Sequence, residues 1–383
     1  MGVFTETDAS VLHDNVISKL QKDIGETLYS GDERRIFGEC MVAWIVAVYN
    51  TIDDVAKQSI LRYARDNILD AIGEQYDCIR LDAQAAKTVL EFSLNTVYSA
   101  DIYIPKGTRV ATDDGHYFAT DTDAVISSGK TSTQVEASAT SGGSEWNGYL
   151  VGSVNIMVDL ISYVDSATNV TITNHGSDRE ADDAYRERIR LSLSKFSTAG
   201  PKNAWKYWAL TADSNISDAY VDLISPNNVQ ITIIMNDGNK ADDKIISKVL
   251  EVVSADDIKP LGDYVTVVSA EEVMYDINVK YYVSSENEAY AVKAIESEKY
   301  TDTSGIERIG AIEKYRLWQD TTISRDINPD KLKALIMNPL GDGTVPGADR
   351  VEITSPTFTE ITGNKVPHFS GKITITHEVK NDE

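Results

Sequence analysis

The first part of the chain places its hydrophobic residues at helical spacing. From Asp8 to Leu28 they recur every three or four positions, which is typical of an amphipathic helix with one buried stripe. Asp8 or Ser10 is placed to cap the start of this helix. A second pattern, free of proline, runs from Glu33 to about Ile72 and predicts a helix longer than is usual in globular proteins.

The second helix has more apolar surface than one neighbouring helix can cover. Its apolar residues form one face and then spread around the helix, so it needs cover on more than one side. That cover comes either from helices of another chain or from later domains of the same chain. The candidate partner-helix interface consists of Met41, Trp44, Ile45, Val48, Tyr49 and Ile52. The longest apolar run, Cys40 to Tyr49, is shorter than the roughly 20 residues of a membrane span, so we expect no membrane insertion.

From about Thr88 the pattern changes to short runs in which apolar and polar residues alternate. Turn sequences separate these runs, such as Pro105–Gly107 and Asp113–Gly115. Alternation with Asp-Gly turns is typical of antiparallel strands. We therefore expect a small antiparallel β-domain over residues 86–175.

The next segment has the signals of a helix start. Ser177 and Glu180 have the spacing of a capping box, and Asp182 and Asp183 suit the positive end of a helix dipole. The predicted buried stripe of this helix is Tyr185, Ile189, Leu193 and Phe196. We expect the helix to stop at Gly200, with Pro201 in the first turn of the next helix.

Strand and helix patterns then alternate to the end of the chain, which predicts two small α/β domains. The expected fold class is α+β and multidomain. It begins with a helical assembly region over residues 1–85 and the β-domain over 86–175. An α/β domain over 176–270 and a C-terminal α/β domain over 271–383 follow.

Charge and cysteine content narrow the partners. The chain has 60 acidic and 36 basic residues and a formal net charge of -24, which disfavours nucleic acid as a partner. The two cysteines, Cys40 and Cys78, form no CxxC pair, so we expect a reducing compartment, neither a disulfide nor a zinc scaffold.

Motifs that organise catalytic or metal-binding groups are not found in the sequence. The paired aspartates are neighbours only along the chain, and the five histidines are dispersed without a His-x-x-x-His pair. We therefore expect no catalytic residue, no cofactor, no metal site and no enzymatic activity.

Several segments, taken in order, resemble the Baseplate J-like family. They are Asn67–Gly73, Ile104–Thr108 followed by Asp114, Gly115 and Phe118, Gly176–Ile189, Ala199–Ala209 and Asn328–Ile336. Each piece alone is a capped helix or a turn, and their order makes the resemblance specific. The residues that match as structural positions are Gly176, Ser177, Asp178, Glu180, Tyr185, Arg186, Arg188, Gly200 and Pro201.

The resemblance implies a baseplate wedge subunit of a contractile tail, from a phage, an R-type bacteriocin (tailocin) or a related contractile injection system. Such a subunit pairs with a second copy of itself and a second wedge protein, and contacts the sheath initiator, the hub and neighbouring wedges in a ring. It also implies assembly in the host cytoplasm, followed by incorporation into the particle. The aromatic content and the β-domain suggest a different function, an extracellular glycan-binding or glycan-cleaving protein. A third hypothesis makes the helical segment a chaperone or scaffold element.

Overall fold

The computed structural model of the protein describes residues 4–197, 200–302, 305–341 and 345–380. It divides into two compact units, a helical unit of Met1–Arg80 with Ala181–Leu193, and a second unit of Leu81–Glu180 with Ser194–Glu383. The mixture of helical, antiparallel and α/β parts confirms the predicted α+β multidomain class.

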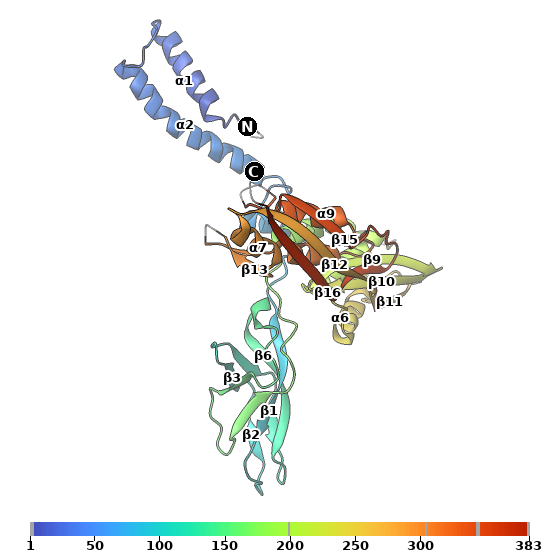
Figure 1. Ribbon diagram of the computed structural model, residues 1–383. Helices are drawn as coiled ribbons and strands as arrows, with labels where there is room; N and C mark the ends of the chain where they lie inside the picture. The colour runs from blue at the N-terminus through green and yellow to red at the C-terminus, as the bar shows by residue number, and fades with distance from the viewer. Residues whose placement is uncertain (1–3, 198–199, 303–304, 342–344, 381–383) are drawn as a thin grey trace. The chain divides into compact units, whose positions relative to one another are not determined.

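The helical unit begins with a hairpin of two antiparallel helices, which lie side by side in Figure 1. Asp8 caps the first of them, since its side chain accepts hydrogen bonds from the backbone N–H groups of Ser10 and Val11. Gly25 ends that helix in the left-handed conformation. The helices of this unit are α1 (Ala9–Ile24), α2 (Glu33–Gln58), α3 (Asp66–Gln75) and α4 (Asp182–Ser192).

The prediction of one helix from Glu33 to Ile72 is wrong. The helix ends at Gln58, and α3 begins at Asp66. The side chain of Gln58 is buried, and its Oε1 accepts a hydrogen bond of 3.0 Å from the backbone N–H of Arg65. This bond between a helix end and the next helix start stabilises a break that neither proline nor glycine marks.

The β-domain is a curled six-stranded antiparallel sheet with the strand order β7-β3-β4-β6-β1-β8. Its end strands β7 and β8 also lie beside each other, so the sheet is nearly closed into a barrel around Leu90, Phe92, Phe118 and Val154. A pair of short strands, β2 and β5, completes the domain. The bounds are β1 (Ala85–Ser93), β2 (Ile102–Ile104), β3 (Arg109–Thr112), β4 (Tyr117–Thr120), β5 (Ala124–Ile126), β6 (Ser132–Gly142), β7 (Val154–Met157) and β8 (Ser166–Asn169), with the 3-10 turn η1 (Ser144–Trp146).

The two ends of this domain are held side by side. Gln84 and Ser177 exchange two backbone hydrogen bonds, of 2.9 and 3.1 Å. Glu180 donates its backbone N–H to the carbonyl of Leu81 at 3.0 Å, and its side chain accepts from the N–H of Leu81 at 3.1 Å. These contacts form a clamp between residues 81–84 and 177–180.

The clamp overturns the predicted capping box. Ser177 and Glu180 bond to residues 81–84, so α4 begins at Asp182, and its N-cap Ala181 has no side-chain cap. The helix also ends earlier than expected, at Ser192, and Leu193 and Phe196 are exposed. Gly200 therefore does not end it, and residues 198 and 199 lie outside the described residues.

Two α/β parts follow, each with a three-stranded sheet. In the first the strand order is β11-β10-β9, and Trp205, Ala209 and Val249 from its helices pack on Ile231. In the second the order is β15-β12-β16, with β16 parallel to β12. The elements are α5 (Lys202–Ala212), β9 (Ile216–Ser225), β10 (Asn228–Met235), α6 (Asp243–Val253), β11 (Tyr264–Ser269), β12 (Glu271–Ser284), α7 (Glu288–Glu296), β13 (Lys299–Thr301), β14 (Glu307–Ile309), α8 (Ala311–Asp320), α9 (Pro329–Met337), β15 (Arg350–Ser355) and β16 (Lys365–Lys380).

Candidate assembly surface and its supporting contacts

The exposed side of α2 is a continuous apolar stripe. Trp44 is 72% exposed and Val48 is 53% exposed, although burial of large apolar side chains usually stabilises a protein. Three- and four-residue spacings align them with further exposed residues along the helix. The α2 stripe, as we call this surface, consists of Phe37, Met41, Trp44, Val48, Ile52 and Val55.

The opposite side of α2 packs on α1. Gly38 and Val42 are buried there, and a Cβ atom on Gly38 would lie 3.0 Å from Leu20 and 3.4 Å from Ile17. The glycine therefore allows the two helices to approach closely. Of the remaining predicted interface residues, Ile45 is half-buried and Tyr49 is 38% exposed.

The segment before α1 is tied to the C-terminal half of α2 through one carboxylate. Asp53 is buried, and its Oδ1 accepts hydrogen bonds from the backbone N–H of Phe4 at 2.7 Å and of Thr5 at 3.3 Å. Lys57 lies 2.6 Å from its Oδ2. The hydrogen bond from Lys57, followed by those from the backbone, lowers the pKa of Asp53 to about 2.

By length and composition α2 also meets the description of a membrane-crossing helix. Its most apolar 18-residue window has a mean hydropathy of 1.3 and is 17% buried, and among the residues that the structure describes it is the one helix of this kind. The ionised Asp53 and its hydrogen bonds to the preceding segment do not suit the interior of a bilayer.

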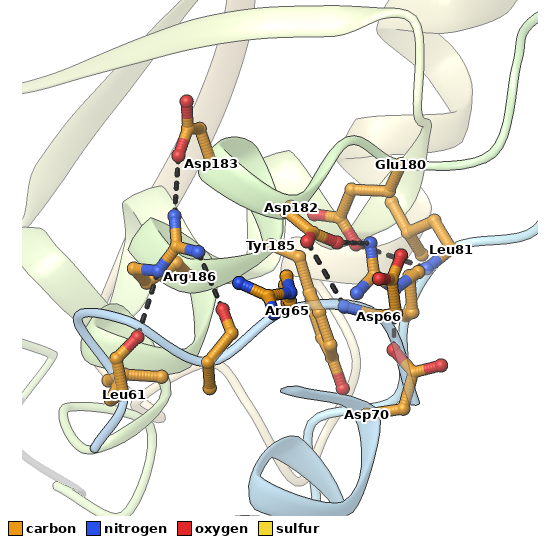
Figure 2. Close-up of polar contacts among 12 residues, drawn as sticks. Leu61, Arg65, Asp66, Asp70, Leu81, Glu180, Asp182, Asp183, Tyr185 and Arg186 are labelled. Carbon is orange, nitrogen blue, oxygen red and sulfur yellow. Dashed lines mark hydrogen bonds and ion pairs between the residues drawn. The ribbon is translucent and has the colours of Figure 1, made fainter. Parts of the chain in front are cut away.

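The base of the helical unit is a polar cluster that joins α3 to α4 (Figure 2). Tyr185 is fully buried, and its hydroxyl donates a hydrogen bond of 2.5 Å to the carbonyl of Cys78. Burial raises the pKa of Tyr185 to about 12. A Cβ atom on Gly73 would lie 1.9 Å from the Tyr185 hydroxyl oxygen, so only glycine fits at this point of α3.

Arg80 completes the cluster. The guanidinium of Arg80 lies 4.6 Å from the centre of the Tyr185 ring and pairs with Asp70 at 2.6 Å and Asp182 at 2.7 Å. Burial acts to raise the pKa of Asp182, but the hydrogen bond from the backbone of Asp66 and the pairing with Arg80 keep it below its ordinary value. Charge pairing and stacking therefore fix α4 against α3.

Arg186 and Arg188 donate hydrogen bonds to backbone carbonyls on either side of α3. Arg186 donates to the carbonyls of Leu61 and Ala64, each at 2.8 Å, and Figure 2 shows it beside Leu61 and Asp183. Arg188 donates to the carbonyl of Ile79 at 2.5 Å. Tyr185, Arg186 and Arg188, which the sequence singled out, thus act together as structural residues of one junction.

The remaining predicted structural positions lie in the second unit. The Asn147 side chain forms two hydrogen bonds of 2.8 Å with the backbone N–H and carbonyl of Gly176. A side chain at Gly176 would meet the carbonyl of Gly143 at 2.4 Å. Asp178 accepts hydrogen bonds from the backbone and the hydroxyl of Ser144, at 2.8 and 2.7 Å.

Gly200 and Pro201 mark the start of α5. Gly200 has a φ of 61°, in the region that favours glycine, and Pro201 is the N-cap residue, one position before the expected first turn.

Asn147 and Arg80 were not identified from the sequence, since each acts through contacts with distant segments. Among the residues that the structure describes, no group of three or more His, Cys, Asp or Glu side chains is arranged to hold a metal ion.

Comparison with known proteins gives two family matches. Residues 89–176 match the Baseplate J-like protein barrel domain, and residues 197–269 match the Baseplate J-like central domain. Baseplate protein J of Escherichia phage P2 is 29% identical over 178 residues, which cover 46% of this chain and 52% of that protein. The chain therefore spans about half the length of this relative.

The chain also aligns with a chain of the anti-feeding prophage baseplate, solved by cryo-electron microscopy. The alignment covers 94% of this chain and 97% of that one, with 10% identity and a TM-score of 0.40, which is too low to establish a common fold. The chain therefore contains two Baseplate J-like domains, the barrel domain followed by the central domain, and is similar over part of its length to baseplate protein J of phage P2.

Proposed function

We propose that this protein is a structural wedge subunit of the baseplate of a contractile tail, without enzymatic activity. It assembles with a second copy of itself and a second wedge protein into a ring around the hub. In this ring it contacts the sheath initiator and helps to transmit the trigger for sheath contraction. Its place is the host cytoplasm during assembly and then the baseplate of the phage tail or tailocin particle. The matches to two Baseplate J-like domains and the similarity to baseplate protein J of phage P2 support this proposal.

The observation that carries the proposal is the α2 stripe. A helix with a row of exposed apolar residues on one side and a partner helix on the other is suited to join a bundle of helices from several chains. Met41 and Trp44, near its centre, are of the residue types that are enriched in the buried core of an interface. We assign this surface to the second wedge protein.

The test is a pair of substitutions on α2 in tail particles assembled from the full chain. Trp44→Glu places a charge in the stripe, whereas Asn50→Glu places one on an exposed position of the same helix that lies off the stripe. A buried interface tryptophan contributes about 2 kcal/mol or more, which corresponds to a roughly thirtyfold loss of affinity for the second wedge protein. We expect Trp44→Glu to lose that partner in co-purification and Asn50→Glu to retain it.

Equal recovery of the second wedge protein with both variants would contradict the assigned surface. Absence of the chain from purified particles would contradict the wedge role itself. Flotation of the wild-type chain with liposomes separates helix packing from membrane insertion, because only a membrane-inserted α2 carries the protein to the top of the gradient.

A further inference from the structure

The C-terminal sheet has a long strand with an open edge. β16 pairs in parallel with β12, and within the described part of the chain no strand lies on its other side. Figure 1 shows β16 as a long arrow alongside β12. The other edge of the sheet is the shorter strand β15.

A β-bulge divides β16 into a covered and an open part. Before the bulge, the carbonyl of Lys365 accepts a hydrogen bond from Ser324, and the N–H of Phe369 donates to Asp320. The pairing with β12 shifts register between Tyr275 and Ile277, where Gly371 has a φ of 83°. Beyond this point, no hydrogen bond of this kind reaches the outer edge from any residue that the structure describes.

The open part, residues 372–379, has the character of a strand that pairs. Its sequence is Lys-Ile-Thr-Ile-Thr-His-Glu-Val, in which polar and apolar residues alternate over the first half. It is rich in β-branched residues and has no proline. Ile373 is 43% exposed and Val379 is 38% exposed. Proteins usually shorten, bend or cover such an edge, because its unpaired N–H and C=O groups accept another strand.

The sequence of this segment is complementary to itself when a second copy runs antiparallel. With Ile375 opposite Ile375 of the other copy, Lys372 faces Glu378 and Thr374 faces Thr376. Each of these pairs occurs twice because the arrangement has twofold symmetry. Opposite charges and paired threonines directly across antiparallel strands stabilise a sheet. A register shifted by two residues no longer places Lys372 of one copy opposite Glu378 of the other.

We infer that two copies of this chain join edge to edge through residues 372–379 of β16, antiparallel and centred on Ile375. The two three-stranded sheets then form one continuous sheet, and the open edge disappears. This interface is the surface used by the second copy in the proposed function, and it depends on that proposal only for the presence of two copies. It is distinct from the α2 stripe, which is assigned to a different protein.

Cross-linking of the purified full chain tests the register. In a background with the exposed Cys40 changed to serine, Ile375→Cys places two thiols on directly opposed residues, about 4.5–5.5 Å apart between Cα atoms, within disulfide range. Ile373→Cys is the matched control. Its two copies are displaced by four residues, about 13 Å along the strand, too far for a disulfide.

A charge exchange provides the second test. Lys372→Glu creates two like-charged pairs with Glu378 and is expected to raise the dissociation constant of the dimer about tenfold in sedimentation experiments. Adding Glu378→Lys restores opposite charges across the strands and with them the affinity. Because Glu378 also pairs with Lys280 of its own copy at 2.6 Å, Glu378→Lys alone serves as the control for the loss of that pair. Lys365→Glu has the same charge change on β16 outside the paired segment, and we expect it to leave the dissociation constant unchanged.

A strong dimer band for Ile375→Cys alone, with rescue in the double charge variant, supports the inference. A chain that stays monomeric would overturn it. Equal cross-linking of both cysteine variants, or no rescue by the charge exchange, would also overturn it. These outcomes concern the purified chain only, so failure here leaves the proposed baseplate role to be decided by the α2 variants in particles.

Discussion

The contact between Gly73 and Tyr185 gives a sharp prediction about the helical unit. In Gly73→Ala the new Cβ atom lies 1.9 Å from the hydroxyl oxygen of Tyr185, whereas ordinary contacts begin at 3.4 Å. Tyr185 then has to move by about 1.5 Å. Such a shift breaks the 2.5 Å hydrogen bond to the carbonyl of Cys78.

The size of the effect follows from three contributions. Overpacking costs about 1–3 kcal/mol, and a buried acceptor without its donor costs another 1–3 kcal/mol or so. Alanine offsets up to about 1 kcal/mol through its better helix propensity. We expect a net loss of about 3 kcal/mol in the free energy that keeps α3 and α4 packed, which is a roughly hundredfold rise in their opening equilibrium.

Hydrogen exchange of the full chain, followed by mass spectrometry, measures this loss locally. Peptides from α3 and α4 should lose protection, while peptides from β1 and β6 serve as an internal reference. Gly31→Ala is the matched control, because a Cβ atom there meets nothing within 4 Å and the backbone is not in the left-handed region.

Tyr185→Phe removes the closest clashing atom and supplies the decisive comparison. It costs about 1–3 kcal/mol by itself, since the carbonyl of Cys78 loses its donor. Combined with Gly73→Ala it should cost less than the sum of the two single effects, because both act on the same contact. Additive costs, or wild-type protection in Gly73→Ala, would refute the reasoning.

Three further predictions concern polar contacts of Asp182, Tyr185 and Asn147. The pKa of Asp182 is lowered in the folded protein, so its pairing with Arg80 stabilises the helical unit at neutral pH and is lost as the pH falls below about 4. Melting temperatures of Asp182→Asn should therefore depend less on pH in this acidic range than those of the wild type. The pKa of Tyr185 is raised to about 12, so its neutral hydroxyl stabilises the fold below about pH 10. This contribution is lost as the pH rises from about 10 to 12. An ultraviolet titration should show one late-ionising tyrosine fewer in Tyr185→Phe, and the same late ionisation in both proteins would exclude the assignment. Asn147→Ala removes both hydrogen bonds to Gly176, so exchange protection should fall by about 1–3 kcal/mol near the clamp and remain unchanged in α3.

Features that depend on nearby residues were predictable from the sequence. Asp8 caps α1 because its side chain reaches backbone groups two and three residues away. The strands of the β-domain were predictable from the alternation of apolar and polar residues and from turns such as Asp113–Gly115. The exposed stripe of α2 was predictable because apolar residues occur around more than one side of that helix.

Features that depend on distant residues were not predictable. Ser177 and Glu180 have capping-box spacing, yet residues 81–84 supply their partners. The end of α2 at Gln58 depends on a hydrogen bond to Arg65 across a turn, without a helix-breaking residue. The requirement for glycine at position 73 comes from Tyr185, which follows an entire domain later in the chain.

The clamp between residues 81–84 and 177–180 also determines how the chain responds to mechanical tension. Its backbone hydrogen bonds join the point where the chain enters the barrel to the point where it leaves. A pulling force along the chain between Arg80 and Ala181 is therefore carried across the clamp, and the strands of the barrel bear no load while these bonds hold. The barrel is thus sheltered from strain in the backbone that connects the two segments of the helical unit.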